Sequence, residues 1–254
     1  MPVGPRLVLL VGLLPILLLG CLSPAFGEAA GDAAPQPPPP ASPHKHVLVI
    51  NSYHLGYPWS DGILRGLQEI VGPAPAVEVY TEFLDTKRVN DAAHLANLAA
   101  LFRHKFSNVT FDVVVAVDSD ALDFVRANRT NLFPQVPVVF CGVHDYQDAL
   151  LEGQGPMTGV VETIDYLGCV ELALELRPTA RRVVVVTDRT RTGVDFERGV
   201  RAVLPSLKGR AEFEFLSLTD MTLPEMKDRL RGLKDDSVVL VLAHFLDRTG
   251  RLYS

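Results

Sequence analysis

The stretch FDVVVAVDSDALDF, residues 111–124, decides the fold class of this chain. Its first part is a nearly continuous apolar run, which is typical of a parallel strand that helices cover on both faces. Its second part passes through Asp118, Ser119 and Asp120 and returns to apolar residues at helical spacing. The stretch therefore predicts a buried strand, a polar seam and a helix in succession, as in α/β proteins.

The same succession recurs along the chain. Ser60 precedes a stripe of apolar residues and is expected to start a helix, while Thr222 and Glu225 have capping-box spacing. Either Thr163 or Asp165 can cap a further helix. We therefore expect an α/β fold with parallel strands. The other apolar runs are VLVI (47–50), VEVY (77–80), VPVVF (136–140), RVVVVT (182–187), EFEFL (212–216) and VVLVLA (238–243).

Composition and charge exclude some classes of function. The 254 residues are 48% hydrophobic and 21% charged, which describes a folded chain with sizeable cores. A net charge of −6 argues against binding to nucleic acid, which requires a concentrated basic face. We predict no cofactor, because the sequence contains no glycine-rich phosphate loop, G-x-S-x-G elbow or H-E-x-x-H motif. The spacing of Cys141 and Cys169 leaves open whether they pair or stay free.

The N-terminus predicts export from the cytoplasm. Arg6 precedes an apolar stretch that is too short and too interrupted for a membrane span, so residues 1–27 read as a signal peptide cleaved after Gly27. The alternative is a lipoprotein signal that ends before Cys21, which would then carry a lipid anchor. Residues 28–46 are rich in Pro and Ala and are expected to form a disordered linker. We expect a periplasmic or extracytoplasmic protein that meets the membrane only through its signal or lipid anchor.

Polar, aromatic and glycine residues follow several of the expected strands. In open parallel sheets, ligands bind outside the carboxyl ends of the strands, where helix N-termini offer unpaired N–H groups. The residues that we predict to bind a ligand are Ser52, Tyr53, Trp59, Asp118, Ser119, Gly142, Asp188, Thr190, Thr192 and His244.

Seven segments in one order resemble a known family. The family is that of the type I periplasmic-binding-protein-like domains of the ABC-transporter substrate-binding type, which includes the extracytoplasmic input domains of sensor histidine kinases. The similar segments are VLVINSYHLGYPWSDG (47–62), EFLDTKR (82–88), FDVVVAVDSDALDF (111–124), NLFPQVPVVFCGV (131–143), TGVVETID (158–165), LALELRPTARRVVVVTDRTRTG (172–193) and LAHFLDRTGRLYS (242–254).

The resemblance implies two Rossmann-like lobes with parallel sheets, residues 47–156 and 157–254, which close around a small molecule. Family members continue past the segment that matches DRTGRLYS, so we expect the second lobe to be incomplete. The implied function is that of an extracytoplasmic, non-catalytic domain that binds an amino-acid-like ligand. Such a domain serves as the sensor input of a histidine kinase or as an ABC-type solute-binding protein, so the implied partners are kinase modules or an ABC permease.

The residues suit such a ligand. Tyr53, Trp59 and Phe140 are expected to stack on a ring, and Asp118 or Asp188 to pair with an ammonium group.

A ligand carboxylate would lie at a helix N-terminus that begins near Ser119 or Thr192. Simpler roles compete: Asp118 and Asp188 can be helix caps, and Trp59 can be a packing residue.

Two other classes of function remain as alternatives. His54, His144 and His244 each follow an expected strand and would converge in a metal-binding protein. Asp118 and Asp120 resemble the paired carboxylates of phosphoryl-transfer or sugar-transfer enzymes, although Asp120 is also explained as an acidic residue in the first turn of a helix.

Overall fold

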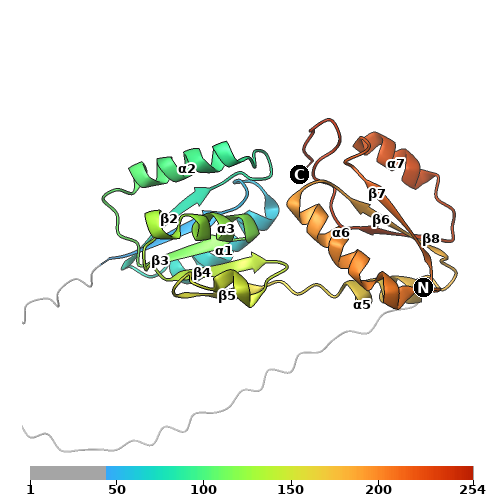
Figure 1. Cartoon of the computed structure of the whole chain (residues 1–254), viewed down its shortest axis with the longest axis horizontal. Helices are drawn as coiled ribbons and strands as arrows, with labels where there is room; N and C mark the ends of the chain where they lie inside the picture. Colours follow the sequence, from blue (N-terminus) through green and yellow to red (C-terminus); the bar gives the residue numbers. More distant parts are fainter. Residues whose placement is uncertain (1–43, 254) are drawn as a thin grey trace, which may run out of the picture. The chain divides into compact units, whose positions relative to one another are not determined.

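The computed structural model describes residues 44–253 (Figure 1). The predicted signal peptide, the alternative lipid-anchor site at Cys21 and residues 28–43 of the expected linker lie outside the described residues. Strand β1 already begins at Lys45, so the last residues of the expected linker belong to the first sheet. Between residues 44 and 253, no helix combines the length and the hydrophobicity that crossing a membrane requires.

The first half of the described chain forms a five-stranded sheet in the order β2-β1-β3-β4-β5, in which every pair of neighbours is parallel. Its strands are β1 (Lys45–Asn51), β2 (Val77–Phe83), β3 (Val113–Val117), β4 (Val138–Val143) and β5 (Met157–Val161). The helical segments are α1 (Pro58–Val71), α2 (Ala92–Lys105), α3 (Ser119–Ala127), α4 (Arg129–Leu132) and the 3₁₀ turn η1 (Asp148–Leu151).

The second half forms a three-stranded parallel sheet in the order β7-β6-β8. Its strands are β6 (Arg182–Thr187), β7 (Glu212–Ser217) and β8 (Ser237–Val241). Its helical segments are α5 (Tyr166–Leu176), α6 (Arg191–Val203), the 3₁₀ turn η2 (Leu204–Leu207) and α7 (Leu223–Arg231). The α/β class with parallel strands, predicted from the apolar runs, is confirmed.

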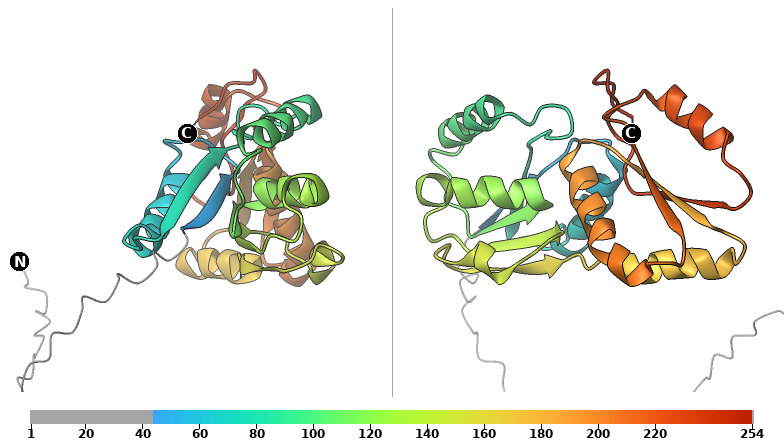
Figure 2. Two further views of the ribbon diagram at one scale, coloured as in Figure 1. Left: turned by 90° about the vertical axis from the view of Figure 1, so that its left-hand side faces the viewer. Right: turned by 45° about the vertical axis from the view of Figure 1, so that its right-hand side comes forward.

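Helices cover both faces of each sheet, which explains why the strands are apolar without alternation (Figure 2). In β3, Val114 packs in one core with α2 and α3, whereas Val115 packs in a separate core with α1. In β6, Val185 faces α5 and α6, and Val184 faces α7. Phe140 lies in the first of these cores, so the expectation that it stacks on a ligand is wrong.

Two of the three expected helix starts are confirmed. Thr222 and Glu225 form both hydrogen bonds of a capping box at the start of α7, and Asp165 caps α5, as expected. The expectation that Ser60 starts a helix is wrong, because α1 begins at Pro58, and Ser60 instead donates a 2.8 Å hydrogen bond to the side chain of Asn51. Proline, with its fixed φ, is well suited to the first turn of a helix, so the helix starts at Pro58 and not at Ser60.

Strand β5 bears on the boundary between the lobes. The sequence places that boundary before Met157, but β5 pairs with β4 and extends the first sheet to Val161. We propose that residues 162–165 form the segment between the lobes.

Candidate functional site

Two adjoining cavities collect residues from both sheets. The first, here the aromatic chamber, has a volume of about 270 Å³. The second, here the polar chamber, has a volume of about 260 Å³. The residues common to both are Tyr53, Lys87, Asp118, His144 and Thr192. The aromatic chamber adds Tyr57, Trp59, Glu162, Phe196 and Phe245, and the polar chamber adds Thr86, Arg88, Asn90, Asp120, Arg189, Thr190, Arg191 and Leu246.

Asp118 lies where both chambers meet, between β3 and α3. Its carboxylate accepts hydrogen bonds from the Tyr53 hydroxyl at 2.7 Å and from the Ser119 backbone N–H at 2.6 Å. It therefore caps α3, as the simpler reading proposed, and it also lines a cavity. With φ 74° and ψ 168°, the residue occupies backbone space that is almost restricted to glycine. Such strain is kept where the surrounding structure requires one particular side-chain position.

Tyr53 follows β1 and brings its hydroxyl to Asp118. Burial, followed by the nearby charge of Asp118, raises the pKa of Tyr53 well above its usual range, so the phenol stays protonated and acts as a donor. Burial likewise raises the pKa of Tyr57 to about 12.

Two predicted residues near Asp118 line neither chamber. Ser52 is fully buried, donates to the carbonyl of Val117 and accepts from the N–H of Ala121, so it ties β1 to β3 and α3. Ser119 is also buried and lines neither chamber.

Aromatic rings form the walls of the aromatic chamber. Trp59, in the first turn of α1, is 43% exposed, which is unusual for a residue of its size. Gly142 makes room for it: a Cβ there would lie 3.4 Å from the indole ring, and the positive φ of 70° favours glycine further. Tyr57 from the first lobe, with Phe196 of α6 and Phe245 after β8, complete the walls.

Lys87 is a central residue that sequence reasoning did not single out. Its ammonium group lies 4.4 Å from the centre of the Tyr53 ring and 4.3 Å from that of Phe245, which are favourable cation–π distances. It also donates a 3.0 Å hydrogen bond to the hydroxyl of Thr192 in α6. Burial lowers the pKa of Lys87. Lys87 lies in EFLDTKR, one of the segments that resemble the family, but a lysine in a loop does not by itself indicate a binding residue.

The start of α6 contributes two of the predicted residues. Thr190 caps the helix by accepting from the N–H of Gly193 and lines the polar chamber, and Thr192 lines both chambers. Asp188 lines neither chamber, because its buried carboxylate is engaged by Thr190 and by the backbone of Phe245.

His244 is not brought to either chamber. It is exposed and stacks on Phe245, whose ring takes the place in the aromatic chamber. The two residues are adjacent in the chain, and the sequence could not show which of their rings lines the cavity.

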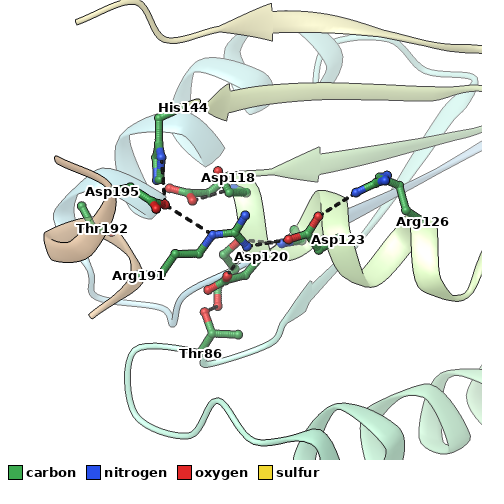
Figure 3. Close-up of polar contacts among 12 residues, drawn as sticks. Thr86, Asp118, Asp120, Asp123, Arg126, His144, Arg191, Thr192 and Asp195 are labelled. Atoms are coloured by element: carbon green, nitrogen blue, oxygen red, sulfur yellow. Dashed lines mark hydrogen bonds and ion pairs between the residues drawn. The ribbon is translucent and has the colours of Figure 1, made fainter. Parts of the chain in front are cut away.

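Charged side chains of the two lobes meet at the polar chamber (Figure 3). Arg191, the first residue of α6, pairs with Asp120 at 2.9 Å and with Asp123 at 2.6 Å, both from α3. Asp195 of α6 lies 3.5 Å from the imidazole of His144, which follows β4.

The carboxyl groups of Asp118 and Glu162 line the aromatic chamber together with the ammonium group of Lys87. Burial raises the pKa of Asp118. Burial, and then the charge of Asp118, raises the pKa of Glu162. Two carboxylates facing one cavity are costly to ionise together, and an ammonium group placed between them would relieve that cost.

The residues of the metal-binding and enzyme alternatives lie as follows. Among residues 44–253, no group of three or more His, Cys, Asp or Glu side chains is arranged to hold a metal ion. His54 bonds the carbonyl of Leu55, and His144 lines both chambers. Asp118 and Asp120 both line the polar chamber, the first bonded to Tyr53 and the second paired with Arg191.

No protein-family model matches the sequence, and the comparison with curated proteins gives no match. Solved structures are similar in fold. A conserved domain protein from Vibrio cholerae O1 biovar El Tor has a TM-score of 0.53 at 17% identity, covering 72% of this chain and 62% of that one. An ABC domain from Streptococcus pneumoniae in complex with L-Trp has a TM-score of 0.53 at 15% identity, covering 78% and 65%.

A branched-chain amino acid transporter substrate-binding protein from Streptococcus pneumoniae, in complex with isoleucine, has a TM-score of 0.50 at 18% identity, covering 77% of this chain and 56% of that one. The chain thus spans less than two thirds of the length of these structures. Of these three structures, the one with isoleucine is described as a substrate-binding protein. With its two parallel sheets, this chain has the type I periplasmic-binding-protein-like fold.

Proposed function

We propose that this chain binds an amino-acid-like small molecule in the aromatic chamber and does not catalyse a reaction. The observation that supports this most is the composition of that chamber. Five aromatic side chains and two carboxyl groups, drawn from both lobes, line one cavity of about 270 Å³. Ligand sites are typically concave, mostly apolar and equipped with a few convergent polar groups.

The chamber suggests how such a ligand is held. Its side chain lies against Trp59 and Phe196, where a planar or branched apolar group gains contact. Its ammonium group lies between the carboxyl groups of Asp118 and Glu162, which both line the chamber. Tyr53 positions the Asp118 carboxylate.

Two structural neighbours agree with this class of ligand. The structure from Streptococcus pneumoniae with L-Trp and the transporter substrate-binding protein with isoleucine both hold an amino acid. Their low identity to this chain means that they support the fold directly and the ligand only by analogy.

We further propose that ligand binding acts through closure of the two lobes. Lys87 from the first lobe contacts Thr192 from the second, and Arg191 from the second pairs with Asp120 from the first. Contacts of this kind form only when the lobes approach, so a ligand between them would favour the closed state. The chain would then act outside the cytoplasm, reached through the signal peptide or a lipid anchor at Cys21, as a solute-binding protein for an ABC permease or as the input domain of a histidine kinase.

Thermal unfolding with a panel of L-amino acids and simple amines tests the proposal. A ligand at about 100 times its Kd adds about 2.7 kcal/mol to the free energy of unfolding, which gives a clear rise in Tm. Asp118→Asn should weaken binding measured by calorimetry. Asp112→Asn is the matched control, because Asp112 precedes the same strand at its other end and pairs there with Lys45. Absence of binding across the panel, or equal weakening by both variants, would contradict the proposal.

A further inference from the structure

A third cavity belongs almost entirely to the first lobe. It is a groove between α2 and α3 with a volume of about 480 Å³, here the helix groove. This volume lies within the range of about 300–1,000 Å³ that is usual for small-molecule sites. The helix groove adjoins the polar chamber at Asp120 and Arg191, but most of its lining comes from α2, from α3 and from the residues next to these helices.

The helix groove has an apolar floor. Ala99 and Phe124 line it and belong to the buried core of the first lobe. Ala92 and Ala96 line it from successive turns of α2, and Ala127 lines it from α3. Because these alanine side chains are single methyl groups, they leave space between the helices for a guest with an aliphatic body.

The acidic end of the helix groove is occupied by a side chain of the second lobe. Asp120 and Asp123 lie three residues apart in α3, and Arg191 of α6 pairs with them at 2.9 and 2.6 Å (Figure 3). A guanidinium offers a planar fork of N–H donors that matches carboxylates in shape and charge. The Arg191 guanidinium therefore stands in for a cationic guest and shows which chemistry this end of the groove accepts.

Separation of the lobes would vacate this acidic end. Among the described residues, Arg191 alone lines the helix groove from the second lobe, so it leaves with α6 when the lobes part. Asp123 then keeps its ion pair with Arg126 of the same helix, at 3.0 Å. Asp120 has no other ion pair within residues 44–253, so its carboxylate would be left at the end of an apolar groove.

We propose that the helix groove is a second ligand site, which binds a small guanidinium or amine with an aliphatic body in place of Arg191. The cationic group pairs with Asp120 and Asp123, and the aliphatic body lies on the apolar floor. This goes beyond the proposed function and uses from it only the separation of the lobes. Because the guest and Arg191 exclude each other, the guest favours open lobes and, by linkage, weakens any ligand that favours closed lobes.

Calorimetry with butylguanidinium chloride at low ionic strength tests this site against two comparison probes. Butylurea has the same shape without the charge, and guanidinium chloride has the charge without the aliphatic body. Butylguanidinium should bind about tenfold more tightly than either probe at equal ionic strength. Small-angle scattering should show a larger radius of gyration with butylguanidinium than with butylurea, because the displaced Arg191 no longer holds the lobes together.

Three variants locate the guest, with circular dichroism to verify folding. Ala96→Leu fills the helix groove and should weaken binding of butylguanidinium about tenfold. Ala93→Leu is the matched control, because it adds the same side chain at an exposed position of α2 that does not line the groove, and it should leave the Kd unchanged. Arg191→Met removes the competing guanidinium and should strengthen binding about tenfold.

Equal Kd values for butylguanidinium and butylurea, or for the two leucine variants, would overturn the proposal. So would an Arg191→Met variant that binds butylguanidinium no more tightly than the unchanged protein. Binding that is lost in Asp118→Asn but kept in Ala96→Leu would assign the cation to the aromatic chamber, against this proposal and in agreement with the proposed function. Binding in the helix groove without binding of any amino acid would retain the second site and refute the proposed function.

Discussion

The strained backbone at Asp118 gives a prediction about stability that separates strain from side-chain contacts. At φ 74° and ψ 168°, a residue with a Cβ costs about 1–3 kcal/mol, whereas glycine adopts this conformation freely. Asp118→Ala and Asp118→Gly lose the same bonds to Tyr53 and Ser119, so those losses cancel in the comparison. Only the alanine variant keeps the strain.

The magnitude follows from two opposing effects. Relief of strain favours the glycine variant by about 1–3 kcal/mol. The greater freedom of glycine in the unfolded chain opposes it by about 0.5–1 kcal/mol. We therefore expect Asp118→Gly to be more stable than Asp118→Ala by roughly 1 kcal/mol, although both variants lose the carboxylate that would bind an ammonium group.

Urea unfolding followed by circular dichroism measures this difference, provided that the two variants have equal m-values. An alanine variant as stable as the glycine variant, or more stable, would refute the reasoning. It would show that Asp118 is not held in a costly conformation.

Three further predictions concern charge and capping. Arg191→Met should loosen the contact between the lobes, which small-angle scattering measures, because it removes the ion pairs with Asp120 and Asp123. It should also lower the free energy of unfolding by about 1 kcal/mol at low salt, and by less as ionic strength rises, which thermal unfolding measures. Thr222→Ala should cost about 1 kcal/mol in urea unfolding, because it removes the capping box with Glu225. Burial raises the pKa values of Asp118 and Glu162 in the free protein, and an ammonium ligand binds their ionised forms. The affinity for the ligand should therefore fall as the pH drops from about 7 to about 4, which calorimetry at several pH values checks. The free energy of unfolding of the free protein should rise over the same pH range through these two groups, which urea unfolding checks.

Local patterns in the sequence predicted the elements well and the site in part. Strands β3 and β6 could be predicted from their continuous valine runs, because a strand that is buried on both faces has apolar residues at every position. The strand β5 was not among the predicted runs, since MTGVV is short and contains Gly159, whose backbone lies against Phe140.

The site itself depends on contacts that no local pattern encodes. Tyr53 and Asp118 were named because polar residues at parallel strand ends converge, and they do meet. Lys87 and Phe245 were missed because their contact joins loops from two lobes, and neither residue stands out within its own segment. Asp188 was named for the same reason as Asp118, but tertiary packing gave its carboxylate to backbone N–H groups instead.

The position of Asp188 has a mechanical consequence. One carboxylate oxygen accepts from Thr190 at the start of α6, and the other accepts from the backbone of Phe245 and Leu246. Two stretches more than fifty positions apart in the chain are thereby pinned to a single buried group. A ligand that moves the start of α6 should therefore move Phe245 as well, so that two walls of the aromatic chamber respond together.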